Sequence, residues 1–230
     1  MRDQTFTPSI QDYAKAVYAL QARGGEAVST NELAQRLGVT PGSASGMVRK
    51  LAELGLLEHV PYRGFRLTPA GKRLALKVIR RHRLLELFLA EALQMSWDQV
   101  HAEAEVLEHA LSEELEQLIA ERLGDPRFDP HGDPIPTADF ELPELQTISL
   151  LELGEGRRGR FVRVSDSDPE KLRYLAKQQI ELGDLLEVKE RQPFGGPLVI
   201  RCPSGERAIG SELAGVMRVE PIGAEDEAAG

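Results

Sequence analysis

The chain has 230 residues, enough for two or three small domains rather than one small core. Its hydrophobic content of 41% and charged content of 28% are those of an ordinary globular protein. It contains no apolar run long enough to cross a membrane and no signal-peptide core, and its single cysteine excludes an intrachain disulfide and a four-cysteine zinc module. We therefore expect a cytoplasmic protein that does not engage membranes.

The net charge of −9 is unevenly distributed along the chain. Residues 1–81 carry 13 Lys and Arg against 6 Asp and Glu, a net charge of +7. The remainder carries 15 basic against 31 acidic residues, a net charge of −16. A basic N-terminal part predicts contact with the phosphates of a nucleic acid, while the acidic remainder serves another purpose.

The first elements follow a helix-turn-helix pattern. An apolar stripe predicts a helix from Pro8 to Arg23. A short helix over Asn31 to Leu37, a turn at Gly38 to Thr40 and a helix from Pro41 to about Leu54 then form the helix-turn-helix unit. The last helix begins with small and hydroxyl-bearing residues, as a recognition helix requires. Its predicted DNA contacts are Thr40, Ser43, Ser45, Arg49 and Lys50.

A predicted β-hairpin follows this unit. The runs Leu57 to Val60 and Phe65 to Leu67 alternate apolar and polar residues around a Pro-Tyr-Arg-Gly turn. Such a hairpin is a wing, from which Arg63 and Arg66 would contact phosphates. With the local positive charge, the pattern predicts a winged helix-turn-helix DNA-binding domain. The alternative is a small packing domain without a ligand.

A long helix is predicted from Ala70 to about Leu93. Its apolar residues exceed what one helix face needs for a local core: Leu74, Val78, Leu84, Leu85, Leu87, Phe88 and Leu89. Surplus apolar surface of this kind suits a helix–helix interface between two copies, so we expect a homodimer.

The stretch VHAEAEVLEHAL, from Val100 to Leu111, has a distinctive polar stripe. If the stretch is helical throughout, two imidazole and two carboxylate side chains share one face of the helix: His101, Glu105, Glu108 and His109. Imidazoles and carboxylates are the ligands of a borderline-to-hard divalent metal, and the alternative is a solvated acidic face. His82 and Glu86, one helical turn apart, form a second imidazole–carboxylate pair and favour a metal site.

The C-terminal part differs in pattern. Residues 125–143 hold five prolines without periodicity and predict a linker, with His131 as a surface loop residue. From Thr147, short β-like runs around one helix at Pro169 to Gln178 predict a barrel of five or six strands. Residues 223–230 are expected to be a disordered tail. The fold class is mainly α with a β C-terminal domain.

Several motifs together resemble those of the diphtheria toxin repressor family of metal-dependent transcription factors. They are PSIQDY, the turn and helix of Gly38 to Leu54, YRGFRLTPAGK, RHRLLE and VHAEAEVLEHAL. The resemblance implies a winged helix-turn-helix domain at residues 1–72 and a helical metal-binding and dimerisation domain at 73–143. It also implies an SH3-like domain, of the kind found in FeoA proteins, at 144–222.

The resemblance also implies two metal sites. The primary site would consist of Asp12, Glu105, Glu108 and His109. The ancillary site would consist of His82, Glu86 and His101, completed from the SH3-like domain by Asp166 and Asp168. In this family a thiol or thioether ligand is typical of iron-responsive members and an all-oxygen set of manganese-responsive members. Because Mn²⁺ favours carboxylate oxygen, we expect Mn²⁺ first and Fe²⁺ second.

One departure from the family pattern concerns Lys15. Two-domain manganese sensors carry a glutamate at this place, so the resemblance implies two separate mononuclear sites here rather than a close binuclear one.

The predicted function is that of a repressor with Mn²⁺ as corepressor. It would bind a palindromic double-stranded DNA operator and control metal-ion homeostasis genes. Alternatives are an iron(II)-responsive repressor, a winged-helix regulator of an organic ligand, and a di-metal carboxylate enzyme. The enzyme would need Glu-x-x-His motifs, which Glu86 and Glu105 do not begin. We therefore expect no enzyme and no small-molecule substrate.

Overall fold

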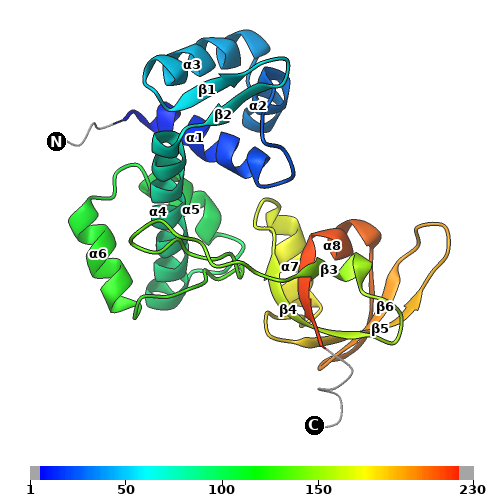
Figure 1. The fold of residues 1–230 in the computed structure, drawn as a ribbon. Helices are drawn as coiled ribbons and strands as arrows, with labels where there is room; N and C mark the ends of the chain where they lie inside the picture. The colour runs from blue at the N-terminus through cyan, green and yellow to red at the C-terminus, as the bar shows by residue number, and fades with distance from the viewer. Residues whose placement is uncertain (1–5, 223–230) are drawn as a thin grey trace. The chain divides into compact units, whose positions relative to one another are not determined.

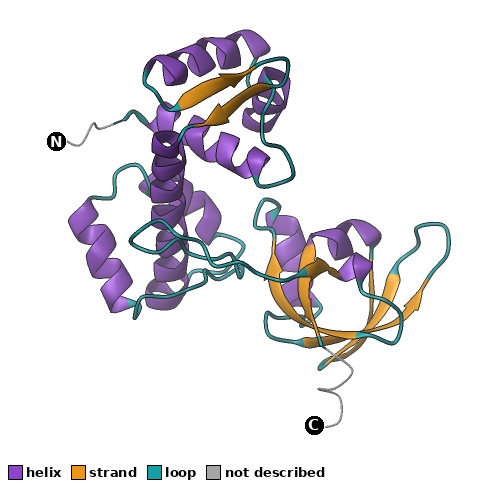
Figure 2. Cartoon of the chain, in the orientation of Figure 1, coloured by secondary structure: helices purple, strands orange, loops and turns teal. Residues whose placement is uncertain are grey.

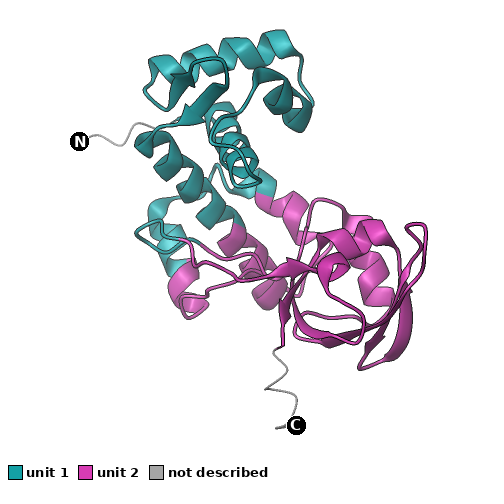
Figure 3. Cartoon of the chain, turned by 45° about the vertical axis from the view of Figure 1, so that its right-hand side comes forward, with its two compact units in different colours: residues 1–82, 105–118, 136–141 teal, residues 83–104, 119–135, 142–230 magenta. Residues whose placement is uncertain are grey.

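The computed structural model describes residues 6–222, so the predicted tail at 223–230 lies outside the described residues. The chain forms two compact units, coloured separately in Figure 3. Unit 1 comprises residues 1–82, 105–118 and 136–141, and unit 2 comprises residues 83–104, 119–135 and 142–230. Within residues 6–222, no helix is both long and apolar enough to span a bilayer.

Unit 1 begins with a winged helix-turn-helix (Figure 1). Its elements are α1 (Pro8–Gln21), α2 (Thr30–Leu37), α3 (Pro41–Glu53), β1 (Leu57–Val60) and β2 (Gly64–Leu67). The side chain of Ser29 caps α2 in a reciprocal capping box with Glu32, and Thr40 caps α3 by accepting a hydrogen bond from the Ser43 backbone N–H. The predicted order of helix, turn, helix and wing is confirmed.

The hairpin of β1 and β2 is held against the segment before α2. The strands pair antiparallel, and the Val28 and Phe65 backbones exchange hydrogen bonds of 2.8 and 3.0 Å. Gly64 has a φ of +114°, and a Cβ there would lie 2.2 Å from the Val28 carbonyl oxygen. Only glycine therefore allows this close approach. The apolar core beneath consists mainly of residues from α1, α2 and α3, and includes Val17, Leu33 and Leu51.

Three further helices follow the hairpin: α4 (Pro69–Leu93), α5 (Val100–Leu107) and α6 (Glu113–Arg122). Helix α4 is continuous from unit 1 into unit 2. The prediction of a helix from Val100 through Leu111 is wrong at its C-terminal end. Helix α5 ends at Leu107, and Glu108 and His109 lie in the turn that follows. The Ala110 N–H bonds the Leu107 carbonyl three residues back, which tightens the last turn.

Unit 2 contains an antiparallel six-stranded sheet that curves around an apolar core (Figure 2). The strand order is β3-β8-β4-β5-β6-β7. The strands are β3 (Ile148–Ser149), β4 (Arg158–Val164), β5 (Leu185–Arg191), β6 (Leu198–Cys202), β7 (Gly205–Ile209) and β8 (Met217–Pro221). Between them lie the 3-10 turn η1 (Leu150–Glu152), α7 (Pro169–Lys177) and α8 (Ser211–Val216). The predicted fold class, mainly α with a C-terminal β domain, matches these elements.

The segment from Asp125 to Ile135, within the predicted linker, is an ordered part of unit 2. The Val164 N–H bonds the His131 carbonyl at 2.9 Å, and the Arg163 guanidinium pairs with the Asp133 carboxylate at 2.8 Å. Gly132 has a φ of +82°, and a Cβ there would lie 1.9 Å from the Val162 carbonyl oxygen. The loop therefore packs directly on β4. As a result His131 is fully buried, and its prediction as a surface residue is wrong.

Candidate functional site

A group of carboxylates and imidazoles lies within unit 1, and we call it the first group. Asp12 is contributed by α1, Glu105 by α5, Glu108 and His109 by the turn after α5, and His82 by α4. One ligand atom each from Asp12, Glu108 and His109 lies within 4.8 Å of the others, and the same holds for His82, Glu105 and Glu108. Of the four residues predicted for the primary site, the structure therefore brings Asp12, Glu108 and His109 together, while Glu105 clusters with Glu108 and His82.

The orientation of the His109 imidazole is fixed by a relay of hydrogen bonds. The Gln11 amide nitrogen donates to the Phe6 carbonyl at 2.9 Å, which turns the Gln11 amide oxygen toward His109. That oxygen lies 2.8 Å from His109 Nδ1 and accepts a hydrogen bond from the Nδ1–H group. Nε2 is then the nitrogen with a free lone pair, and it faces Asp12 and Glu108. This is the tautomer that a metal-binding histidine needs.

Asp12 carries an acceptor atom without a donor. Its Oδ1 lies 2.9 Å from His109 Nε2, but this approach lacks hydrogen-bond geometry, and the atom has no hydrogen-bond partner among residues 6–222. Burial raises the pKa of Asp12, and the nearby carboxylates Glu108 and Glu105 add to this effect, while His109 and Lys15 oppose it. A buried carboxylate oxygen and an imidazole lone pair that face each other suit a shared cation.

Glu108 is the most enclosed carboxylate of the group. It is fully buried, its Oε2 lies 2.6 Å from His82 Nδ1, and its Oε1 lies 2.6 Å from Lys15 Nζ. Glu105 is more exposed, at 42% of its side-chain surface, and its Oε1 lies 2.8 Å from the same ammonium. The donor set of three carboxylates and imidazole nitrogens fits a divalent cation of hard-to-borderline character.

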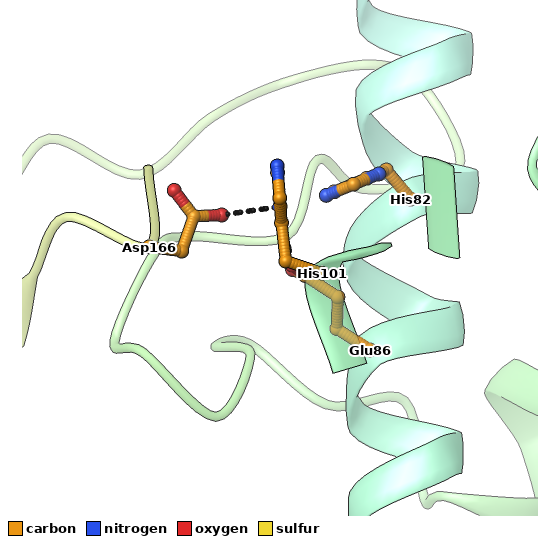
Figure 4. Close-up of side chains that lie close together, drawn as sticks. All are labelled: His82, Glu86, His101 and Asp166. Carbon is orange, nitrogen blue, oxygen red and sulfur yellow. Dashed lines mark hydrogen bonds and ion pairs between the residues drawn. The ribbon is translucent and has the colours of Figure 1, made fainter. Parts of the chain in front are cut away.

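A second group lies within unit 2 and comprises Glu86, His101 and Asp166 (Figure 4). His101 Nδ1 lies 2.9 Å from an oxygen of Asp166 and 3.1 Å from Glu86 Oε1. Hydrogen bonds to Asp166 and then to Glu86 raise the pKa of His101 to about 10. His82, also drawn in Figure 4, lies one helical turn before Glu86 on α4. The imidazolium therefore forms ion pairs with two carboxylates and offsets one of their two negative charges.

Asp129 and His131 extend the second group, and the sequence interpretation missed both. Glu86, Asp129 and His131 are buried, and each offers a ligand atom within 4.8 Å of the others. His131 Nε2 donates to the Trp97 carbonyl at 2.7 Å, so its Nδ1 keeps a lone pair, which has no hydrogen-bond partner in the described part of the chain. Burial, Asp133 and Glu86 raise the pKa of Asp129 well above its usual value.

The two aspartates predicted from the SH3-like domain have different positions. Asp166 follows β4 and bonds His101, as described above. Asp168 instead caps α7, where its side chain accepts a hydrogen bond of 3.0 Å from the Glu170 N–H. The structure therefore brings only Asp166 into the second group.

The residues predicted to contact DNA are exposed and lie on α3 and the hairpin. They are Thr40, Ser43, Ser45, Arg49, Lys50, Arg63 and Arg66. Ala44 and Leu51 of α3 face the core, which leaves the polar side of the helix outward. Arg63 and Arg66 form surface ion pairs with Glu26 and Glu58. Such exposed pairs are weak and would exchange readily for phosphates.

Comparison with known proteins places these features in one family. Residues 5–65 match the N-terminal DNA-binding domain of iron-dependent repressors, and residues 68–137 match their metal-binding and dimerisation domain. The diphtheria toxin repressor of Corynebacterium efficiens is 30% identical over 91% of this chain and 94% of its own length. The chain belongs to the diphtheria toxin repressor family of metal-dependent transcriptional repressors. Residues 148–221 also match the FeoA domain.

Relatives in this family respond to different metals. The iron-dependent repressor IdeR of Mycobacterium tuberculosis is 33% identical over 63% of this chain and 57% of its own length. A solved manganese-dependent transcriptional repressor in complex with manganese is 42% identical, with a TM-score of 0.86, and the match covers 93% of this chain and all of that one. Membership of the diphtheria toxin repressor family thus leaves manganese and iron both open.

The candidate residues are distributed over the three regions that match known domain families. The DNA-binding model includes Asp12 and every predicted DNA contact except Arg66, which directly follows it. The metal-binding model includes the acidic and imidazole residues of α4, α5 and the loop around His131. The FeoA model includes Asp166 and Asp168. Both candidate groups therefore combine residues from two of the matched regions.

Proposed function

We propose that this protein is a manganese-responsive repressor in which the first group is the sensing site. The observation that carries the proposal is the cluster of Asp12, Glu108 and His109, which contains no sulfur and shares Glu108 with a second cluster that includes Glu105. Mn²⁺ lies low in the Irving–Williams series and binds best where oxygen ligands predominate. Iron(II) is the second candidate, because iron-dependent repressors are among the relatives.

The proposed mechanism follows from where these residues lie in the chain. Asp12 belongs to α1 of the DNA-binding region, whereas Glu105, Glu108 and His109 belong to the metal-binding region. These four residues would hold the cation, whose positive charge would offset the repulsion between the carboxylates. The residues then hold α1 in one position, and with it the recognition helix α3. Fixed spacing of two recognition helices selects operator half-sites separated by whole turns of DNA.

The partners we propose are a second copy of the chain and a palindromic operator in metal-homeostasis genes, in the cytoplasm. The α4 residues from which a homodimer was predicted are mostly buried within the single chain, among them Val78, Leu84 and Leu85, so the prediction that they form the interface is wrong. Apolar residues that are exposed on α5 and α6 instead support an interface between copies: Val106, Leu107, Leu115 and Leu118. We propose no catalytic activity and no small-molecule substrate. The domain limits at residues 72 and 143 remain part of the proposal.

For the second group we propose a regulatory metal site formed by Glu86, His101 and Asp166, with His82 as a further ligand. The burial of Asp129 and His131 beside Glu86 supports adding these two residues to it. Asp168 is the weakest member of the predicted set, because its carboxylate caps α7.

The test is DNA binding by purified protein, metal-free and then titrated with Mn²⁺, Fe²⁺ and Zn²⁺. We expect binding only with metal, at lower concentrations of Mn²⁺ than of Fe²⁺. Asp12→Ala should abolish the metal response, while Asp139→Ala, a change of an exposed turn residue in the same unit, should preserve it. Equally tight DNA binding in chelator would contradict the proposal and favour a regulator of an organic ligand. Activation by Fe²⁺ at the lower concentration would make the protein an iron sensor.

A further inference from the structure

Lys15 lies inside the first group. It follows Asp12 by three residues on α1, so the two side chains share one face of the helix. Its ammonium lies 2.8 Å from Glu105 Oε1 and 2.6 Å from Glu108 Oε1, and only 20% of the side-chain surface is exposed. An ammonium is enclosed to this extent only when carboxylates compensate its charge.

The ammonium holds the same atom that the candidate metal site needs. Glu108 Oε1, which binds Lys15, also lies 3.6 Å from His109 Nε2 and faces the open side of that imidazole. The other oxygen of Glu108 is bonded to His82. A cation held by Asp12, Glu108 and His109 must therefore share Glu108 Oε1 with Lys15 or displace the ammonium from it.

The charges of the first group favour a single divalent cation. Asp12, Glu105 and Glu108 supply three negative charges, and Lys15 neutralises one of them. With the histidines neutral, the remaining two charges balance one divalent cation. A second divalent cation would leave the enclosed group with a net charge of +2, which is costly away from water.

We infer that the Lys15 ammonium offsets part of the negative charge of the first group. It thereby limits this group to one divalent ion and weakens the affinity of the group for that ion. This inference rests on the proposed metal-sensing function and adds a residue that sets the metal concentration at which the protein responds. Lys15 also has a structural role, because it joins α1 to Glu105 and Glu108 before metal arrives.

The test compares Lys15→Met and Lys15→Gln with the parent protein, all in a His101→Ala background that disables the second group. Free Mn²⁺ is measured by electron paramagnetic resonance during titration of chelator-treated protein. We expect one Mn²⁺ per chain in the parent protein and an affinity at least about tenfold tighter in Lys15→Met, since a neighbouring positive charge has been removed. Lys15→Gln, which keeps a hydrogen-bond donor without the charge, should also bind more tightly.

Thermal unfolding supplies a second readout and a check on folding. Without metal, Lys15→Met should melt below the parent, because Glu108 loses its buried partner. Saturating Mn²⁺ should then raise its melting temperature by more than it raises that of the parent. Lys177→Met, at an exposed position on α7, is the control for loss of one positive charge and should change neither quantity.

The outcomes separate this inference from the proposed function. Unchanged or weaker Mn²⁺ affinity in both folded Lys15 variants would overturn the inference while leaving metal sensing intact. Two Mn²⁺ ions in the first group of the parent, or an equal gain of affinity in Lys177→Met, would also overturn it. Absence of Mn²⁺ binding in every variant and in the wild-type protein would instead refute the metal-sensing proposal itself.

Discussion

The two candidate metal groups neutralise their carboxylates in different ways. In the first group the positive charge is the Lys15 ammonium, placed between Glu105 and Glu108. In the second group it is a proton on His101, shared with Asp166 and Glu86. A lysine keeps its charge across the physiological pH range, whereas a histidine proton can leave when metal binds. The positive charge in the first group is therefore less sensitive to pH than the one in the second group.

The largest effect expected from this difference is the pH dependence of the second group. Metal binding there must release the proton from His101, whose pKa is raised to about 10 by Asp166 and Glu86. Between pH 8.5 and 6.5 we therefore expect its Mn²⁺ affinity to fall about 100-fold, or about tenfold per pH unit. The measurement is Mn²⁺ titration of Asp12→Ala protein, in which the first group is disabled.

The same Mn²⁺ titration of His101→Ala protein, in which the second group is disabled, measures the pH dependence of the first group. Burial alone would lower the pKa of Lys15, but Glu108 and Glu105 raise it above its usual value, so the ammonium stays charged throughout this range. We expect the affinity of this group to change less than that of the second group. Equal pH slopes in the two variants would contradict the distinction.

The stability of the metal-free protein should depend on pH in the opposite direction to the Mn²⁺ affinity of the second group: it should be greater at low pH. The folded-state pKa of His101 lies above its unfolded value of about 6.5, so its ion pairs stabilise the folded state fully below about pH 6.5. That contribution is lost as the pH rises toward 10. The difference in melting temperature between wild type and His101→Ala should therefore shrink over this interval, and a constant difference would argue against the raised pKa.

A smaller effect is expected from Gln11, which orients the imidazole of the first group. Gln11→Leu removes the acceptor for His109 Nδ1, so the ring can adopt the other tautomer and Nε2 no longer presents a fixed lone pair. We expect about a tenfold loss of Mn²⁺ affinity in the His101→Ala background, as for other residues that orient metal ligands. Gln35→Leu, an exposed change on α2, is the control. An unchanged affinity would mean that Gln11 serves packing alone.

The smallest effect is expected at Asp168. Asp168→Ala removes the cap of α7 and should destabilise the protein by about 1 kcal/mol, as measured by denaturant unfolding. Its Mn²⁺ affinity should remain that of the wild type, whereas Asp166→Ala should weaken the second group. A loss of Mn²⁺ affinity in Asp168→Ala would return this aspartate to the metal site.

The local elements could be predicted because their signals are local. The caps Ser29 and Thr40, the turn glycine Gly38 and the apolar periodicity of α1 act within a few residues of themselves. The types of metal donor are equally visible in the sequence. Their grouping came from the resemblance to a family and not from the helical pattern, because the stripe from His101 to His109 is divided in the structure. His101 faces Glu86 and Asp166, while Glu105 and Glu108 face Lys15 and His82.

The sequence by itself determined the order of helix, turn, helix and wing, the curved sheet after residue 147, and a donor set without sulfur. The tertiary structure decided which donors meet and what neutralises them. Burial of His131 depends on the packing of its loop on β4, and the position of the Lys15 ammonium depends on contacts across 90 or more residues. Such contacts have no local signature, because they arise only when distant segments pack and bring their charges out of water together.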